Sequence, residues 1–335
     1  MIWLTWRQFR IQAWTALATL TALAVALVIT GPEVTRLYHS SGFAGCRTDC
    51  AALSSGFLNQ VINGTTGPLY WLGIAVMFVT PALIGVFWGA PLVARELEAG
   101  THRLVWSQSV PRSRWLVAKL LGGSLVSMAT VGLFSLAVTW WADPIDSAYL
   151  NRMFPEIFAA RGIVPIGYAA FAFVVGVTVG MVLRRTVPAM AVTLVVVAAV
   201  QLVMPFLVRG QLIQPVEVTA PFQTTAVKSL HIKDGGGITV TGRVSQPGAW
   251  VVSNRTVTPS GVTFTGPVDA EACGRTSFSQ PKCMAWLDTL NLRQEASYQP
   301  ANRFWALQWY EATVLLTLAL ALAGFSFWWI RRRLT

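Results

Sequence analysis

The chain has 335 residues, of which 54% are hydrophobic and only 12% are charged. A soluble domain carries roughly 25% Asp, Glu, Lys and Arg, so this composition excludes an ordinary cytosolic enzyme. The apolar residues gather in blocks of about 20, the length that crosses a hydrocarbon core of about 30 Å at 1.5 Å per residue. The sequence is therefore that of a polytopic membrane protein, with a formal net charge of +11.

Six apolar stretches are long enough to span a bilayer, and they predict an all-α membrane protein with six transmembrane helices. They cover residues 13–30, 71–93, 115–141, 163–183, 187–208 and 309–330. The first stretch follows two arginines, as in a signal peptide, but no A-x-A-like cleavage site comes after it. We interpret it as a permanent transmembrane helix.

Positive charge is concentrated in the loops that alternate to one side of the membrane. That side carries twelve Arg and Lys residues against two acids, a net charge of +10, whereas the other side has thirteen against twelve, a net charge of +1. Because Lys and Arg are retained on the cytoplasmic side, both termini are predicted to be cytoplasmic in the plasma (inner) membrane. The basic loops favour anionic membrane lipids or an acidic partner and argue against nucleic acid.

All four cysteines fall in the two loops that this topology places outside. An extracytoplasmic compartment permits disulfides, and the economical pairing joins Cys46 to Cys50 and Cys273 to Cys283. Four cysteines allow three connectivities, so the other two pairings remain open. A zinc site is the alternative, but His39 and His231 do not stand at finger-like spacing.

A change of composition marks residues 209–308, which are polar and rich in Thr, Val, Gly and Pro. Alternation of apolar and polar residues predicts a strand at Ile238–Val244, with further strands at Ala249–Val252 and Val262–Thr265. A short helix is expected over residues 284–296. We therefore predict a small β-rich extracytoplasmic domain inserted between helices five and six.

Motifs for catalysis are missing from the sequence. It has no G-x-x-x-x-G-K-[ST], H-E-x-x-H or G-x-S-x-G pattern, and we expect neither catalytic residues nor a metal site. No acid, His or Arg lies at mid-depth in a predicted span, and Lys119 and Glu311 lie near span ends, where we expect them to reach water. These features disfavour an enzyme, a proton-driven antiporter and a channel lined by charged rings.

Two G-x-x-x-G motifs lie in the predicted spans, at Gly85–Gly89 in the second and Gly176–Gly180 in the fourth. Such motifs let helix backbones approach closely. We interpret them as packing contacts within the chain, and an interface between two copies is the alternative.

The loop after the second span concentrates charge beside an apolar helix, which continues without a break into Arg95-Glu96-Leu97-Glu98. Residues 95 and 98 are neighbours at i, i+3, so Arg95 and Glu98 can pair while Glu96 points elsewhere. A charged hairpin in which Gly100 ends one helix would explain the charge but not its concentration. We expect a docking surface on which Glu96 is the acid most available to a partner's Arg or Lys.

This loop resembles that of the permease subunits of type-2 ABC exporters. In that family an R-E-x-E-x-G-T-like segment ends span two, and a P-x-S-R-like turn and a Lys in the next span follow. The matching residues here are Arg95, Glu96, Glu98, Gly100, Thr101, Pro111-Arg112-Ser113-Arg114 and Lys119. The segment from Tyr298 to Glu311 is similar to actinobacterial permeases, and the large outer domain departs from relatives that have only a short hairpin there.

The resemblance implies a permease that works with two copies of a separate ABC ATPase and with a second permease subunit, as a homodimer or heterodimer. ATP and magnesium would bind to the ATPase, and this chain would hold no cofactor. Residues 94–114 would be the coupling loop, and its contact residues would be Arg95, Glu96, Glu98, Gly100, Thr101 and Arg103. The resemblance also implies a cytoplasmic interfacial helix over residues 1–12.

The predicted organisation is thus spans one to five in residues 13–208, the outer domain in 209–308, and the sixth span with a basic tail in 309–335. An uncharged interior is compatible with ATP-driven export of a lipid-like or amphiphilic substrate. The alternative is a non-transporting membrane module of an ABC complex whose outer domain senses or binds an envelope ligand.

Overall fold

The computed structural model describes residues 2–47, 50–101, 111–149, 152–232, 237–243, 246, 248–266, 269, 271–274 and 279–333. The chain divides into two compact units. The first, here the helical unit, comprises Met1–Leu212 and Trp305–Thr335, and the second, the inserted unit, comprises Ile213–Phe304.

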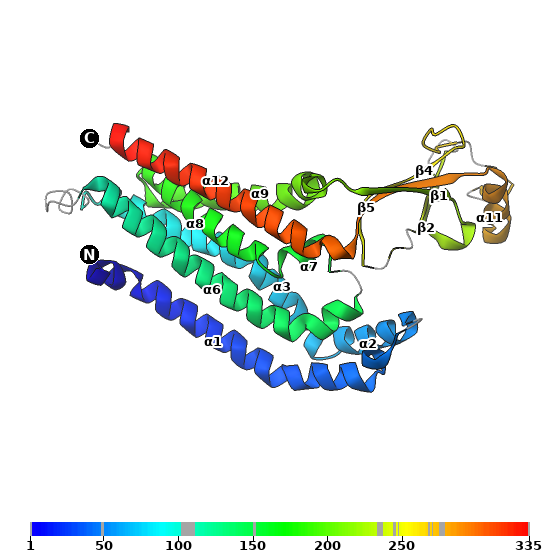
Figure 1. Cartoon of the computed structure of the whole chain (residues 1–335), viewed down its shortest axis with the longest axis horizontal. Coiled ribbons are helices and arrows are strands. Elements are labelled where there is room, and N and C mark those ends of the chain that lie inside the picture. The colour runs from blue at the N-terminus through cyan, green and yellow to red at the C-terminus, as the bar shows by residue number, and fades with distance from the viewer. Residues whose placement is uncertain are drawn as a thin grey trace. The chain divides into compact units, whose positions relative to one another are not determined.

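Among the described residues, six helical segments are long and apolar enough to cross a membrane (Figure 1). They are Trp14–Ser40, Thr66–Glu98, Arg112–Ala148, Val164–Leu183, Thr186–Leu212 and Ala301–Arg333. The six predicted spans are confirmed. Most are longer than predicted because helical hydrogen bonding continues past the apolar stretch, into residues whose polar ends can reach the headgroup region.

The second and fifth spans each contain a π-helical segment. The second consists of α3 (Thr66–Leu83), the π-helical η2 (Ile84–Gly89) and α4 (Ala90–Glu98). The fifth consists of α9 (Thr186–Val203), the π-helical η3 (Met204–Val208) and α10 (Arg209–Leu212). The remaining helices of this unit are α1 (Ile2–Ser40), α2 (Ala51–Asn63), α6 (Arg112–Ala148), α7 (Pro155–Ala159), α8 (Val164–Leu183) and α12 (Phe304–Arg333).

Helix α8 forms the core of the helical unit, where α3, η2, α4, α6 and α9 pack around it. In its most apolar window 78% of the residues are buried, compared with 11% in the first span. The other spans expose large apolar side chains such as Leu136, Val195 and Leu320. Exposed apolar surface on long helices is what contact with lipid chains requires, because those chains are as apolar as Leu.

The two G-x-x-x-G motifs pack against each other where η2 crosses α8. A Cβ atom at Gly176 would overlap the carbonyl oxygen of Gly85, and one at Gly180 would lie 2.6 Å from the carbonyl oxygen of Ala90. Only residues without a side chain allow the two backbones to come this close. The motifs therefore make contacts within the chain, which confirms the first of the two interpretations.

The inserted unit contains a three-stranded antiparallel sheet of order β1-β5-β4 and a two-stranded sheet of β2 and β3. Its elements are β1 (Val216–Pro221), β2 (Val227–Ile232), β3 (Ile238–Gly242), β4 (Trp250–Val257), α11 (Gln280–Thr289) and β5 (Arg293–Gln299). In β3, Ile238 and Val240 are buried, as the alternation predicts. The β-rich domain between helices five and six is confirmed, and Val244 lies outside the described residues.

Two expectations for the inserted unit are wrong. The helix expected over 284–296 ends at Thr289, and Arg293–Gln299 is the central strand, paired with both β1 and β4. Pairing on both sides overrides the local preference for helix. Residues 262–265 form no strand, because only Thr263 pairs, in an isolated bridge with Val257.

All four cysteines form disulfides, Cys46 with Cys50 and Cys273 with Cys283, which is the pairing that the sequence favoured. The second disulfide lies in the core of the inserted unit with Ile238 and Leu287. Because every cysteine sulfur atom is bonded to another, none is left as a thiolate ligand for zinc.

Candidate coupling site

The predicted coupling residues lie at the end of α4 and in the turn that follows. Buried Val93, Ala94 and Leu97 are on one side of α4, which packs against α8 and α9. Arg95, Glu98 and Thr101 are exposed. The end of the second span is thus fixed by its apolar face and presents charged and polar side chains on the other.

Gly100 follows the last turn of α4 with a φ of +70°. This is the left-handed conformation at a helix C-terminus that favours glycine, so the predicted role of Gly100 in ending the helix is confirmed. Arg103 lies outside the described residues.

Glu96 is not the acid available to a partner, and that expectation is wrong. Its Oε1 atom lies 2.6 Å from Nζ of Lys119, and the two side chains are only 16% and 6% exposed. Lys119 also donates to the carbonyl oxygen of Leu92 at 3.1 Å and lies over the Trp115 ring. The expectation that Lys119 reaches water is therefore wrong. Its ammonium group is buried, and the Glu96 carboxylate beside it offsets the cost of removing that charge from water.

Glu98 binds the start of α9. Its Oε2 atom accepts hydrogen bonds from the backbone N–H of Thr186 at 3.0 Å and from the Thr186 hydroxyl at 2.7 Å. Thr186 is the first residue of α9, where unsatisfied N–H groups and the helix dipole favour a negative charge. Among the described residues no ion pair joins Arg95 to Glu98, so the expected i, i+3 pair is wrong.

Two carboxylates therefore fasten the end of α4 to two different helices. We name the set Glu96, Lys119, Glu98 and Thr186 the α4 clamp. Glu96 binds α6 and Glu98 binds α9, while α4 itself packs against α8. The end of α4 is therefore joined to three helices.

A second set of charged residues lies at the opposite end of the helical unit, and their pairing was not predicted. Arg209 of α10 and Glu311 of α12 form an ion pair with Nε 2.6 Å from Oε2, and both side chains are completely buried. The Tyr168 hydroxyl donates to Glu311 at 3.1 Å, and Arg209 donates to the carbonyl oxygen of Pro155 at 3.3 Å. The expectation that Glu311 reaches water is wrong.

Asp146 and Arg161 form another buried pair at this end, with Nε 2.7 Å from Oδ2. The Tyr70 hydroxyl donates to the same carboxylate at 2.8 Å. Asp146, Arg161, Arg209 and Glu311 each lie near a span end, which is the signal that the sequence offers for them. Their pairing joins residues 15 and 102 positions apart, and apolar periodicity gives no information on that.

Within the described part of the chain, no group of three or more His, Cys, Asp or Glu side chains could hold a metal ion. The family model described as "ABC-2 membrane transporter related" matches residues 17–209, more than half of the chain. This match includes the second to fourth spans, most of the first and fifth, and the α4 clamp, and it ends before the inserted unit begins. No curated protein and no solved structure matches the chain.

Proposed function

Since the chain belongs to the ABC-2 membrane transporter related family, we propose that it is the membrane-spanning permease subunit of an ATP-driven exporter. Membership in this family points to a permease of an ABC transporter, a membrane component that associates with an ABC ATPase and is generally not an enzyme. Export, the amphiphilic substrate, and the assembly with two ATPase copies and a second permease subunit are parts of the proposal.

The α4 clamp carries the proposal that this chain is coupled to an ATPase. Arg95, Gly100 and Thr101 lie next to the clamp, and Arg95 and Thr101 are exposed. In the proposed complex these residues, with Arg103, contact the ATPase, which binds ATP and magnesium. Closure of the ATPase displaces the turn at Gly100, and Glu96 and Glu98 carry the displacement to α6 and α9.

The proposed orientation places the α4 clamp and both termini in the cytoplasm. Its support is the net charge of +10 on this side against +1 on the other, because positive loops are retained in the cytoplasm. The inserted unit is then extracytoplasmic, a compartment in which its Cys273–Cys283 disulfide is stable.

A non-transporting role in sensing an envelope ligand is the second candidate. The observation that favours it is a cavity of about 630 Å³ in the inserted unit, whose lining includes four polar residues, Thr219, Asp288, Asn291 and Arg293, beside apolar ones. Liposomes containing the complex separate the two functions, since only an exporter moves lipid or another amphiphile across the bilayer when ATP is added.

The test of coupling is purification with the ATPase and the ATPase rate in proteoliposomes. Arg95→Glu is expected to reduce ATPase co-purification at least about tenfold, because losing one partner of a desolvated charge pair costs about 2–5 kcal/mol. Glu98→Gln is expected to keep the ATPase bound but to weaken the substrate dependence of hydrolysis. Arg332→Glu, the same charge change at an exposed position at the end of α12, is the matched control.

Unchanged co-purification in Arg95→Glu together with normal coupling in Glu98→Gln would show that this loop is only a connector. Thermal unfolding of each variant in detergent separates a loss of coupling from a loss of fold.

A further inference from the structure

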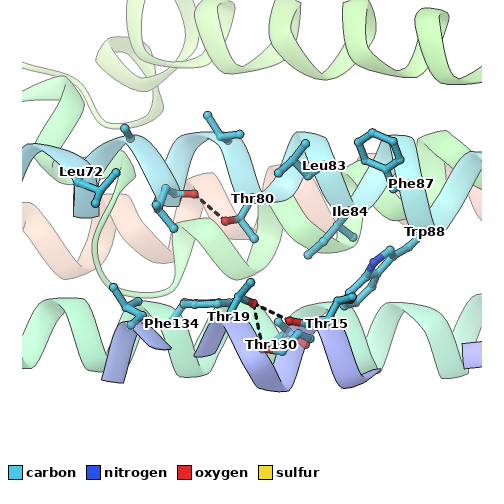
Figure 2. A pocket seen from close by; sticks show the side chains of 15 residues that line it. Thr15, Thr19, Leu72, Thr80, Leu83, Ile84, Phe87, Trp88, Thr130 and Phe134 are labelled. Carbon is cyan, nitrogen blue, oxygen red and sulfur yellow. Dashed lines mark hydrogen bonds between the residues drawn. The ribbon is translucent and has the colours of Figure 1, made fainter. Parts of the chain in front are cut away.

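An apolar groove of about 610 Å³ lies between α1 and the second span, with α6 behind it (Figure 2). Its α1 side runs from Thr15 to Leu23, and its other side runs along α3 and η2 from Leu72 to Trp88. The volume is in the range of ligand pockets, roughly 300–1,000 Å³. Phe134 and Ile84 are 5% and 3% exposed and form its floor, whereas Leu72 and Phe87 are both 55% exposed on its rim.

Three of the four threonine hydroxyl groups that line this groove donate hydrogen bonds within their own helices. Thr19, Thr80 and Thr130 donate to backbone carbonyl oxygens three or four residues earlier, at 2.7–3.0 Å, as Figure 2 shows for Thr19 and Thr80. These threonines therefore present methyl groups to the groove. An occupant gains apolar burial there and few directed hydrogen bonds, which suits a hydrocarbon chain.

The groove is long enough for one extended acyl chain. Leu72 and Trp88 are sixteen residues apart, or about 24 Å along the helix axis. One leaflet contributes about 15 Å of the hydrocarbon core, so a chain that enters at one headgroup layer fits within the groove.

Positive charge flanks one end of the groove, where Figure 2 shows Trp88 of η2 reaching toward Thr15 of α1. Arg95 is exposed about two turns beyond Trp88. The nearby acids Glu96 and Glu98 are bonded within the α4 clamp. An anionic headgroup at this end would therefore meet the charge of Arg95, with an interfacial Trp beside it.

We propose that the groove binds one acyl chain of an anionic phospholipid, with the headgroup at the Trp88 end, and that this lipid class is the substrate of the permease. The substrate role rests on the proposed function, whereas the lipid site itself does not.

The experiment uses the full chain in nanodiscs of phosphatidylcholine that contain phosphatidylglycerol with a photoactivatable acyl chain. Mass spectrometry of the labelled peptides should place the label in Thr15–Leu23 and Leu72–Trp88. Val79→Trp and Leu72→Trp fill the groove and should reduce this labelling about tenfold, the factor for losing the burial of roughly two methylenes. Val195→Trp, at an exposed position on α9 outside the groove, should leave it unchanged.

A phosphatidylcholine probe with the same acyl chain should label the groove less than the anionic probe does. Equal labelling by both probes would overturn the headgroup preference. Label spread evenly over the exposed spans would overturn the site, as would a disulfide between two copies of Thr80→Cys, which would show a second copy in the groove.

Transport assays separate this inference from the proposed function. Groove labelling in a chain that associates with no ATPase would overturn the proposed function and leave the lipid site standing. Normal ATP-driven lipid movement in Val79→Trp, with groove labelling lost, would overturn the substrate role of this site and leave the permease function standing.

Discussion

Buried charges in the helical unit occur in pairs, and each pair joins separate segments of the chain. Removing a charge from water costs several kcal/mol, and a carboxylate at hydrogen-bond distance offsets that cost. Exposed pairs such as Arg255–Glu295 contribute only about 0–1 kcal/mol. Among the described residues the buried pairs are Lys119–Glu96, Arg161–Asp146 and Arg209–Glu311.

The Arg209–Glu311 pair leads to a prediction on stability. Glu311→Leu should lower the free energy of unfolding by about 3–5 kcal/mol, because it leaves a buried guanidinium without its carboxylate. The double variant Arg209→Met/Glu311→Leu should regain most of that loss, since no charge is then buried. Denaturant unfolding in detergent measures both variants, with Asp143→Leu, which breaks the exposed pair with Arg152, as the control. A single variant as stable as the parent chain would contradict the argument.

At the residue scale, features that depend on residues close in the sequence could be predicted. The partners of charged residues that are distant in the sequence could not. The left-handed Gly100 and the Cys46–Cys50 disulfide depend on residues within a few positions of each other. The partner of Glu96 is 23 positions away and that of Glu311 is 102 positions away. Apolar patterns locate the helices that carry such residues, but they do not say which faces of those helices meet.

At the scale of elements, the contact between η2 and α8 determines how closely the central helices pack. Gly176→Ala should destabilise the helical unit by about 1–3 kcal/mol, because its Cβ atom would overlap the backbone of η2. Gly324→Ala in α12 is the matched control, since a Cβ atom there meets no atom within 4 Å. Thermal unfolding in detergent compares the two, and equal melting temperatures would show that η2 moves aside without cost.

Long apolar helices were predictable because length and hydrophobicity alone indicate a transmembrane span. The strand β5 was not predictable from the sequence. Gln294 and Ala296 lie in a strand because they pair with β1 and β4, which are distant in the sequence. The π-helical segments could not be predicted from apolar periodicity either. They change the hydrogen bonding of one or two turns and leave the apolar span unbroken.

At the scale of the whole molecule, an even number of spans brings both termini to one end of the helical unit, the end where α4 is followed by α6 (Figure 1). In intact cells, a membrane-impermeant thiol reagent should label Ser55→Cys and Ser260→Cys but not Ser107→Cys. The native cysteines are disulfide-bonded, so they do not react and need no replacement. Labelling of Ser107→Cys from outside would reverse the proposed orientation.

The buried pair of Arg209 and Glu311 can form only late in the synthesis of the chain. Glu311 leaves the ribosome 102 residues after Arg209, which at 5–20 residues per second is a delay of roughly 5–20 s. During that time the fifth span exists with an arginine that lacks its carboxylate, and the whole inserted unit is made in the interval. The sixth span therefore completes the helical unit only after the inserted unit has been synthesised, and a chain truncated before Glu311 retains an arginine without its carboxylate.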